Sequence, residues 1–365
     1  MTSARERPQP LLSFNDPPPY SPHMNPLSPD DERPVRRWYH NAYLFVTVIL
    51  ILSPHPSLLY FLVNHYLKTI NAPIQFTTHL LVTYGLTFFA LSSLIICVAR
   101  DPGPVSVDEG EDDSNGGEVG LSEALLDMDE DFNSPAKWCR KCWAPKPERT
   151  HHCSMCGRCV LKMDHHCPWL GYRCVGHRTY PAFLHLLTCV TLLAIYISAV
   201  CASFIRYAFS NPFDVDESIP FHAIGLFFAG CIFGLVIGSF FVYHLYLVTT
   251  NQTTVEHISP FLLLRYLPRL PQTGHKLSDP PLEHELSFPQ RRLIKDAHAS
   301  IRLYDVGWKK NWAQVLGWNR RFGWMTRLLC GGAGMGDGKV FPKNIRSEEL
   351  LERLAKELVE VDKDH

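Results

Sequence analysis

The residues that could do chemistry are concentrated between positions 139 and 174 of this 365-residue chain. Seven of the twelve cysteines and four histidines lie there. They are Cys139, Cys142, Cys153, Cys156, Cys159, Cys167 and Cys174, with His151, His152, His165 and His166. Zinc prefers thiolate and imidazole ligands, and Cys-x2-Cys pairs usually supply two corners of a closed tetrahedral site. These side chains are numerous enough for two four-ligand zinc sites, with some left over.

The surplus includes the residue types of a covalent catalyst. Asp164, His165 and Cys167 lie within four positions of one another. A nucleophilic cysteine needs a base within hydrogen-bond reach, and a carboxylate can orient that base. The spacing alone leaves two interpretations open. The three residues form a nucleophile with its base and carboxylate, or they are further zinc ligands and incidental neighbours.

Four long apolar segments must position this stretch. A helix needs about 20 apolar residues to cross a bilayer, and the four segments cover residues 41–67, 77–98, 183–207 and 221–248. The first contains Pro54 and Pro56, which a membrane helix tolerates as a kink. Four such helices in a soluble protein would need an unusually large core. We therefore expect an all-α polytopic membrane protein with four transmembrane helices and a cytosolic zinc-braced, cysteine-rich domain between the second and the third.

The charged residues next to the spans indicate their orientation, because cytosolic loops hold an excess of Lys and Arg. The loop between the first two spans has only Lys68, and the loop between the last two is acidic at Asp214, Asp216 and Glu217. Both loops are expected on the lumenal side, so the two termini and the cysteine-rich stretch are expected in the cytosol. No charged-then-apolar leader precedes Arg33. The reducing cytosol disfavours disulfides, which leaves metal as the better explanation of the cysteines.

Two segments before the cysteines are expected to lack a packed core. Residues 1–38 form a proline-rich tail that we expect to be disordered. Within it Pro17, Pro18, Pro19 and Tyr20 fit a PPxY ligand for a WW-domain protein, a match that also occurs by chance in such tails. Residues 101–136 form an acidic linker, whose positions 104–133 hold eleven acidic residues and no Lys or Arg.

The other expected parts follow from these limits. The zinc domain covers residues 137–180, the helix pairs cover 39–100 and 181–250, and a cytosolic tail covers 251–365. Leucines at helical spacing in the last part of this tail predict an amphipathic helix, which rests on the protein or on the membrane surface. The net charge of −1 argues against a generally basic nucleic-acid binder. Only 19% of the residues are charged, which agrees with a chain that is partly in lipid.

The stretch 139–176, CRKCWAPKPERTHHCSMCGRCVLKMDHHCPWLGYRCVG, resembles the cysteine-rich domain of the DHHC protein S-acyltransferases, or palmitoyltransferases. Three further motifs are similar to those of the family. They are Asp101-Pro102-Gly103 after the second span, Thr253-Thr254-Val255-Glu256 after the fourth, and Tyr304-Asp305-Val306-Gly307 followed by Asn311 and Trp312 in the tail. The resemblance covers about two-thirds of the chain and leaves out both tails.

The resemblance implies a role for each matching residue. Cys167 would be the acylated nucleophile, His165 its base and Asp164 the carboxylate that fixes the imidazole. Two structural zinc ions would brace the domain. One would be held by Cys139, Cys142, His152 and Cys159, and the other by Cys153, Cys156, His166 and Cys174. Palmitoyl-CoA would donate the acyl group in a ping-pong reaction to cysteines of cytosolic or membrane proteins, in an endomembrane such as the ER, Golgi or vacuole.

Other assignments stay open. Trp169 is either a wall of the acyl cavity or a packed aromatic residue. Basic residues of the loop, such as Arg149 and Arg158, could meet the phosphates of coenzyme A or only satisfy the charge bias. Six residues separate Cys167 from Cys174, where the family usually has five, so the second zinc site needs a small bulge or holds Cys174 differently. A membrane-anchored zinc scaffold without catalysis is the alternative function, and a zinc-finger nucleic-acid binder is disfavoured by the acidic linker.

Overall fold

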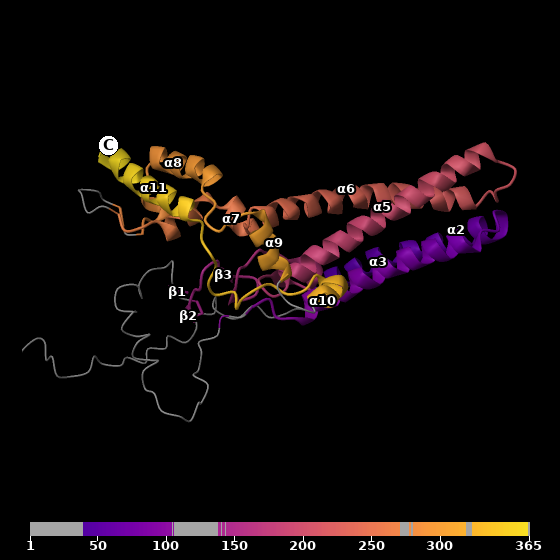
Figure 1. Cartoon of the computed structure of the whole chain (residues 1–365), viewed down its shortest axis with the longest axis horizontal. Coiled ribbons are helices and arrows are strands. Elements are labelled where there is room, and N and C mark those ends of the chain that lie inside the picture. The colour runs from indigo at the N-terminus through magenta and orange to yellow at the C-terminus, as the bar shows by residue number, and fades with distance from the viewer. Residues whose placement is uncertain are drawn as a thin grey trace, which may run out of the picture. The chain divides into compact units, whose positions relative to one another are not determined.

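The computed structural model describes residues 39–103, 105, 138–139, 141–142, 144–270, 277–278, 280–318 and 323–363 (Figure 1). The PPxY sequence at positions 17–20 and nearly all of the acidic linker lie outside the described residues.

The described residues contain four helices that are long and apolar enough to cross a membrane, as the sequence predicts. The first is built from α1 (His40–Leu52), α2 (Pro54–Leu62) and the π-helix η2 (Val63–Thr69). The others are α3 (Pro73–Ala99), α5 (Tyr180–Ser210) and α6 (Ile219–Thr249). The first helix is interrupted at Ser53, where Pro54 begins α2 and can donate no backbone hydrogen bond.

The helices pack on one another through two apolar clusters, and α5 contacts both α3 and α6 (Figure 1). One cluster lies at the ends of the spans that carry the cysteine-rich segment and includes Leu94, Phe183 and Val248. The other includes Phe61 and Phe204. The outward faces of the spans remain apolar and exposed, which is the surface that lipid requires.

The cysteine-rich segment contains three antiparallel hairpins of two or three residues a strand. They pair β1 (Trp138–Cys139) with β2 (Ala144–Pro145), β3 (His151–Cys153) with β4 (Arg158–Val160), and β5 (His165–Cys167) with β6 (Arg173–Val175). An isolated two-stranded hairpin is marginally stable in water. These hairpins therefore need a brace other than an apolar core.

The tail after α6 is mostly helical. Its elements are α7 (Thr254–Ile258), η4 (Pro260–Tyr266), η5 (Glu283–Glu285), α8 (Phe288–Ser300), α9 (Trp308–Leu316), α10 (Gly323–Cys330) and α11 (Ile345–Lys363). The apolar face of α11, with Leu351, Leu354 and Leu358, packs in one cluster with Ile294 of α8 and Leu263 of η4. The predicted amphipathic helix thus lies on the protein.

Truncating the centre of this cluster should open the tail locally. Leu358 is fully buried, and replacing it by alanine leaves a cavity that costs about 2–5 kcal/mol. We expect Leu358→Ala to speed amide hydrogen exchange in α8 and α11 and to leave the membrane helices unchanged. Glu352→Ala, at an exposed position of the same helix, is the control. Equal exchange in the two variants would contradict this packing.

Candidate functional site

The structure brings the eight predicted ligand residues together into two clusters of three cysteines and one histidine. In the first, Nδ1 of His152 lies 3.2 Å from Sγ of Cys142, 3.6 Å from Sγ of Cys139 and 4.0 Å from Sγ of Cys159. A tetrahedral zinc ion with bonds of about 2.0 Å to nitrogen and 2.3 Å to sulfur separates its ligands by about 3.5–3.8 Å. The donor set and spacing fit a closed metal site.

The second cluster has the same composition and spacing. Nδ1 of His166 lies 3.4 Å from Sγ of Cys156, 3.6 Å from Sγ of Cys153 and 3.8 Å from Sγ of Cys174. The sulfurs of Cys156 and Cys174 are 3.4 Å apart. Each cluster has four ligands, so each is consistent with a structural metal site that has no open position.

The extra residue before Cys174 is accommodated within the turn of the β5–β6 hairpin. The turn begins with a 3-10 helix, η3 (Pro168–Leu170), and continues through Gly171 and Tyr172 with φ of 70° and 59°. The Tyr172 backbone N–H donates to the Pro168 carbonyl oxygen at 3.1 Å. The hairpin register then pairs Cys174 with His166, so the longer turn does not move Cys174 out of its cluster.

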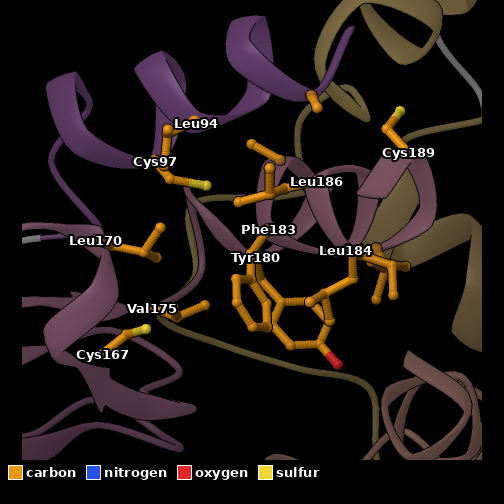
Figure 2. Packing of buried hydrophobic residues seen from close by; sticks show 14 of the residues in the cluster. Leu94, Cys97, Cys167, Leu170, Val175, Tyr180, Phe183, Leu184, Leu186 and Cys189 are labelled. Carbon is orange, nitrogen blue, oxygen red and sulfur yellow. The ribbon is translucent and has the colours of Figure 1, made fainter. Parts of the chain in front are cut away.

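Strand geometry separates two functions along β5. Successive side chains of a strand point to opposite faces. His166 points into the second cysteine cluster, so His165 and Cys167 share the other face. Figure 2 shows Cys167 and Val175 of this hairpin facing Tyr180 and Phe183 of α5, in the apolar cluster at the ends of the spans.

The Asp164 carboxylate orients the His165 imidazole through a hydrogen bond. Its Oδ2 lies 2.7 Å from Nδ1 of His165, and the carboxylate is 1% exposed. Burial opposes the charge on each group, but their hydrogen bond outweighs it. The pKa of Asp164 is therefore lowered. The pKa of His165 is raised to about 9, against burial, by Asp164 and by its hydrogen bond to Cys167. The pair favours a proton on the imidazole, which suits a base that takes a thiol proton.

The Thr253–Glu256 motif after the fourth span supplies further hydrogen bonds to the Asp164 carboxylate. The backbone N–H of Thr254 donates to Oδ1 of Asp164 at 3.0 Å, and the Thr254 hydroxyl donates to Oδ2 at 2.8 Å. Thr253 and Glu256 form a capping box at the start of α7, which fixes Thr254 at the first helical position. The motif therefore starts α7 and places Thr254, at the N-terminus of this helix, within hydrogen-bond distance of the Asp164 carboxylate.

Glu256 is in turn held by Arg149, a residue whose role the sequence left open. The Arg149 guanidinium donates to both carboxylate oxygens of Glu256 at 2.7 Å. It also donates to the side chain and backbone oxygens of Asn251, at 3.0 and 2.9 Å. It stacks on Tyr304 at 4.3 Å and on Phe341 at 5.1 Å. Arg149 is fully buried, so the suggestion that it meets coenzyme A phosphates is wrong.

The other two motifs hold the domain and tail to the span ends. Asp101 accepts from the Gly103 backbone N–H at 2.9 Å and from Arg158 at 2.7 Å, which ties the end of α3 to β4. In the tail, the fully buried Asn311 amide donates to the Thr249 carbonyl oxygen and to Asp305 at 2.8 Å. The tail motif therefore caps the end of α6.

Two aromatic positions flank the site. Trp169 is half-exposed, and its ring lies 5.6 Å from that of Tyr43 on α1. His244 of α6, which the sequence analysis missed, is fully buried and lies 6.1 Å from the His165 ring between centroids. The Tyr180 hydroxyl is 3.1 Å from its Nδ1. An ionisable residue inside a span is a functional candidate by default, which is the signal that could have identified it.

Breaking the buried ion pair should cost far more than breaking an exposed one. Arg149→Ala leaves the Glu256 charge buried without a partner, at a cost of about 3–5 kcal/mol. Arg158→Ala is the matched control, because its bond to Asp101 has the same 2.7 Å length but side chains that are 38% and 41% exposed, a pair worth about 0–1 kcal/mol. Thermal unfolding in detergent measures both. Equal shifts in Tm would refute the structural role of Arg149.

Comparison with known proteins agrees with this geometry. The DHHC palmitoyltransferase family model matches residues 132–260. The chain is 37% identical over 253 residues to "Probable protein S-acyltransferase 15" of Arabidopsis thaliana, and this alignment covers 67% of this chain and 80% of the relative. It is 28% identical over 326 residues to "Palmitoyltransferase ZDHHC15" of Rattus norvegicus, in an alignment that covers 88% of this chain and 82% of the relative. It is 31% identical over 206 residues to "Palmitoyltransferase ZDHHC2" of Homo sapiens, in an alignment that covers 56% of this chain and 46% of the relative. The chain therefore belongs to the DHHC palmitoyltransferase family and is an integral-membrane protein S-acyltransferase.

Proposed function

We propose that Cys167 carries the acyl group as a thioester intermediate and that palmitoyl-CoA is the donor. The observation that supports this most directly is the 2.7 Å contact of His165 with Asp164, on a strand that presents His165 and Cys167 on one face. His165 takes the Cys167 proton, and the thiolate attacks the thioester carbonyl. The C–S bond to coenzyme A breaks, and the departing thiolate receives the proton from His165. A substrate cysteine then repeats the exchange and regenerates the Cys167 thiol.

The apolar neighbours of Cys167 support an acyl chain that lies among the spans. Cys167 belongs to the same cluster as Leu170 and Phe183 (Figure 2). Val248 of α6 is a further member. At about 0.8 kcal/mol per buried methylene, the fourteen or so methylenes of a palmitoyl chain contribute on the order of 10 kcal/mol at most. Trp169, at the edge of this cluster and against α1, is the proposed wall of the acyl site. Thioester is exchanged for thioester, so the reaction needs no external energy source.

Zinc is the proposed metal of both clusters. The first site uses Cys139, Cys142, His152 and Cys159, and the second uses Cys153, Cys156, His166 and Cys174. Bound zinc would supply structural bracing only, since four protein ligands leave no position for a water or a substrate. The residues that move protons are outside both sites. They are His165, which takes and returns the proton, and Cys167, which loses and regains it, while Asp164 orients the imidazole.

The topology and partners are also proposals. The charge bias of the loops supports cytosolic termini and a cytosolic cysteine-rich domain of residues 137–180, in an endomembrane such as the ER, Golgi or vacuole. Substrates would be cytosolic or membrane proteins with accessible cysteines, and a WW-domain protein is proposed to bind positions 17–20. The acidic residues 101–136 would link the second span to the zinc domain, and residues 251–365 would form the cytosolic tail.

The first test concerns the acyl-enzyme. Purified protein incubated with palmitoyl-CoA should acquire a hydroxylamine-labile acyl group, and Cys167→Ser should lack it because an unactivated hydroxyl is a far weaker nucleophile. Cys231→Ser removes an exposed cysteine of α6 and should keep the label. An unlabelled wild type would support the scaffold alternative, and a labelled Cys167→Ser would place the nucleophile elsewhere.

The second test concerns the hydrogen bond that the Thr254 hydroxyl donates to Asp164. Thr254→Val removes one hydrogen bond to a buried carboxylate, worth about 1.5–3 kcal/mol, so acyl-enzyme formation should slow by roughly 10- to 150-fold. Thr254→Ser keeps the hydroxyl and should restore most of the rate. Single-turnover labelling measures both. An unchanged rate in Thr254→Val would show that this bond does not position the carboxylate.

The third test counts the metal. Elemental analysis of the wild type should find two zinc ions per chain. Cys142→Ala and Cys156→Ala each remove one ligand of a different cluster, so each should lower the count by about one, since three ligands bind structural zinc poorly. A wild type with one zinc ion, unaffected by Cys156→Ala, would mean that the longer turn before Cys174 disables the second site.

A further inference from the structure

The short helix α10 carries an apolar face that no described part of the protein covers. Trp324, Met325, Leu328 and Leu329 are 57%, 51%, 52% and 40% exposed. Their spacing places all four on one side of the helix. Gly323 and Cys330 are buried and lie on the opposite side, towards the protein. The apolar face therefore points outward, away from the rest of the chain.

The position of α10 is fixed by contacts with two membrane spans. The helix packs beside α3 and α5. The His185 imidazole of α5 hydrogen-bonds the Leu328 backbone, and its Nδ1 lies 2.7 Å from the Ser93 hydroxyl of α3. Just after the helix, Gly331 has a φ of +74° and touches the Pro181 carbonyl oxygen, where a Cβ would overlap it. The end of α10 is thus held against the spans themselves.

These contacts also give the depth of α10. Ser93 lies six residues before the end of α3 at Ala99, and His185 lies five residues after the start of α5 at Tyr180. At 1.5 Å per residue, both are about 8–9 Å from the ends of their helices. Interfacial helices bury their apolar face about 5–10 Å into the boundary between headgroups and acyl chains. The contact point lies within this zone.

We propose that α10 is an interfacial membrane helix, whose apolar face lies in the lipid leaflet on the side of the cysteine-rich segment. Lipid is favoured as the occupant because the surface is continuous with a membrane-facing one. α3, which α10 contacts, exposes Phe88 and Ile95 by 59% and 63%. Tryptophan is enriched at this depth of a bilayer, and Trp324 and Trp318 are both about half-exposed. Arg327 is off this face and donates to the Gly317 carbonyl oxygen at 3.2 Å.

The other amphipathic helices of the tail behave differently. α8 and α11 bury their apolar faces on each other and on η4, in a cluster that includes Ile294 and Leu358. α10 takes no part in that cluster. The amphipathic helices of the tail therefore cover their apolar faces in two ways, α8 and α11 by packing on protein and α10 by the proposed contact with lipid. This inference is independent of the proposed roles of Cys167 and His165.

Photo-crosslinking of the full-length chain in lipid nanodiscs tests the placement. p-Benzoylphenylalanine replaces one exposed aromatic residue in each of three variants: Trp324 of α10, Phe228 within α6 and Phe288 of α8, which are 57%, 60% and 82% exposed. Phe228 is the reference for a lipid-facing side chain and Phe288 for a water-facing one. The lipid adduct from Trp324 should be within about two-fold of that from Phe228 and about ten-fold above that from Phe288.

A fourth variant controls for the helix face. Thr326 is exposed on the polar side of α10, so the same photo-reactive residue there should give far less lipid adduct than at Trp324. Equal yields at these two positions would mean that the helix is not oriented as inferred. A Trp324 yield no higher than that of Phe288, or adducts mainly to another protein or a second copy of the chain, would overturn the proposal.

Discussion

The arrangement of the site depends on one buried ion pair, between Arg149 of the cysteine-rich segment and Glu256 after the fourth span. A guanidinium without water is costly unless every donor is paired, and here the acceptors come from Glu256 and Asn251 at 2.7–3.0 Å. Glu256 also accepts from the Thr253 backbone at 2.9 Å, which fixes the start of α7. Thr254 then reaches Asp164. The cysteine-rich segment can bury Arg149 only when it docks on the end of α6, and that docking completes the support of Asp164.

The second Cys/His cluster and the proposed catalytic residues share one strand, β5, whose successive side chains point to opposite faces. The described part of this segment has only a small apolar cluster, with Val160 and Met163 beside the cysteines, so metal at the two proposed sites would replace hydrophobic burial as its brace. When His166 is fixed in the second cluster, the alternation of β5 directs His165 and Cys167 to the opposite face. A structural metal in this position would therefore orient the proposed nucleophile without touching it, and its loss would disturb the geometry of acyl transfer indirectly.

The features predictable from the sequence were those encoded locally. Apolar runs gave the four spans, with ends off by a few residues. The third, for example, begins at Tyr180 rather than at 183, because Pro181 suits the first turn of a helix. Cysteine spacing predicted two four-ligand sites, and the resemblance to the DHHC family assigned a ligand set to each, which the hairpins bring together. The partner of Arg149 lies 107 positions away, and that of Asn311 lies 62 positions away. No local pattern encodes such contacts, so the sequence left the role of this buried arginine open.

The location of the reacting thiol follows from two demands that oppose each other. The coenzyme A part of the proposed donor needs water, and its alkyl chain needs an apolar environment, so the proposed nucleophile Cys167 must lie where both are available. The structure meets this at the ends of α3, α5 and α6, whose side chains form the apolar cluster around Cys167. Acyl-chain preference should therefore be encoded in the spans, because they line that cluster.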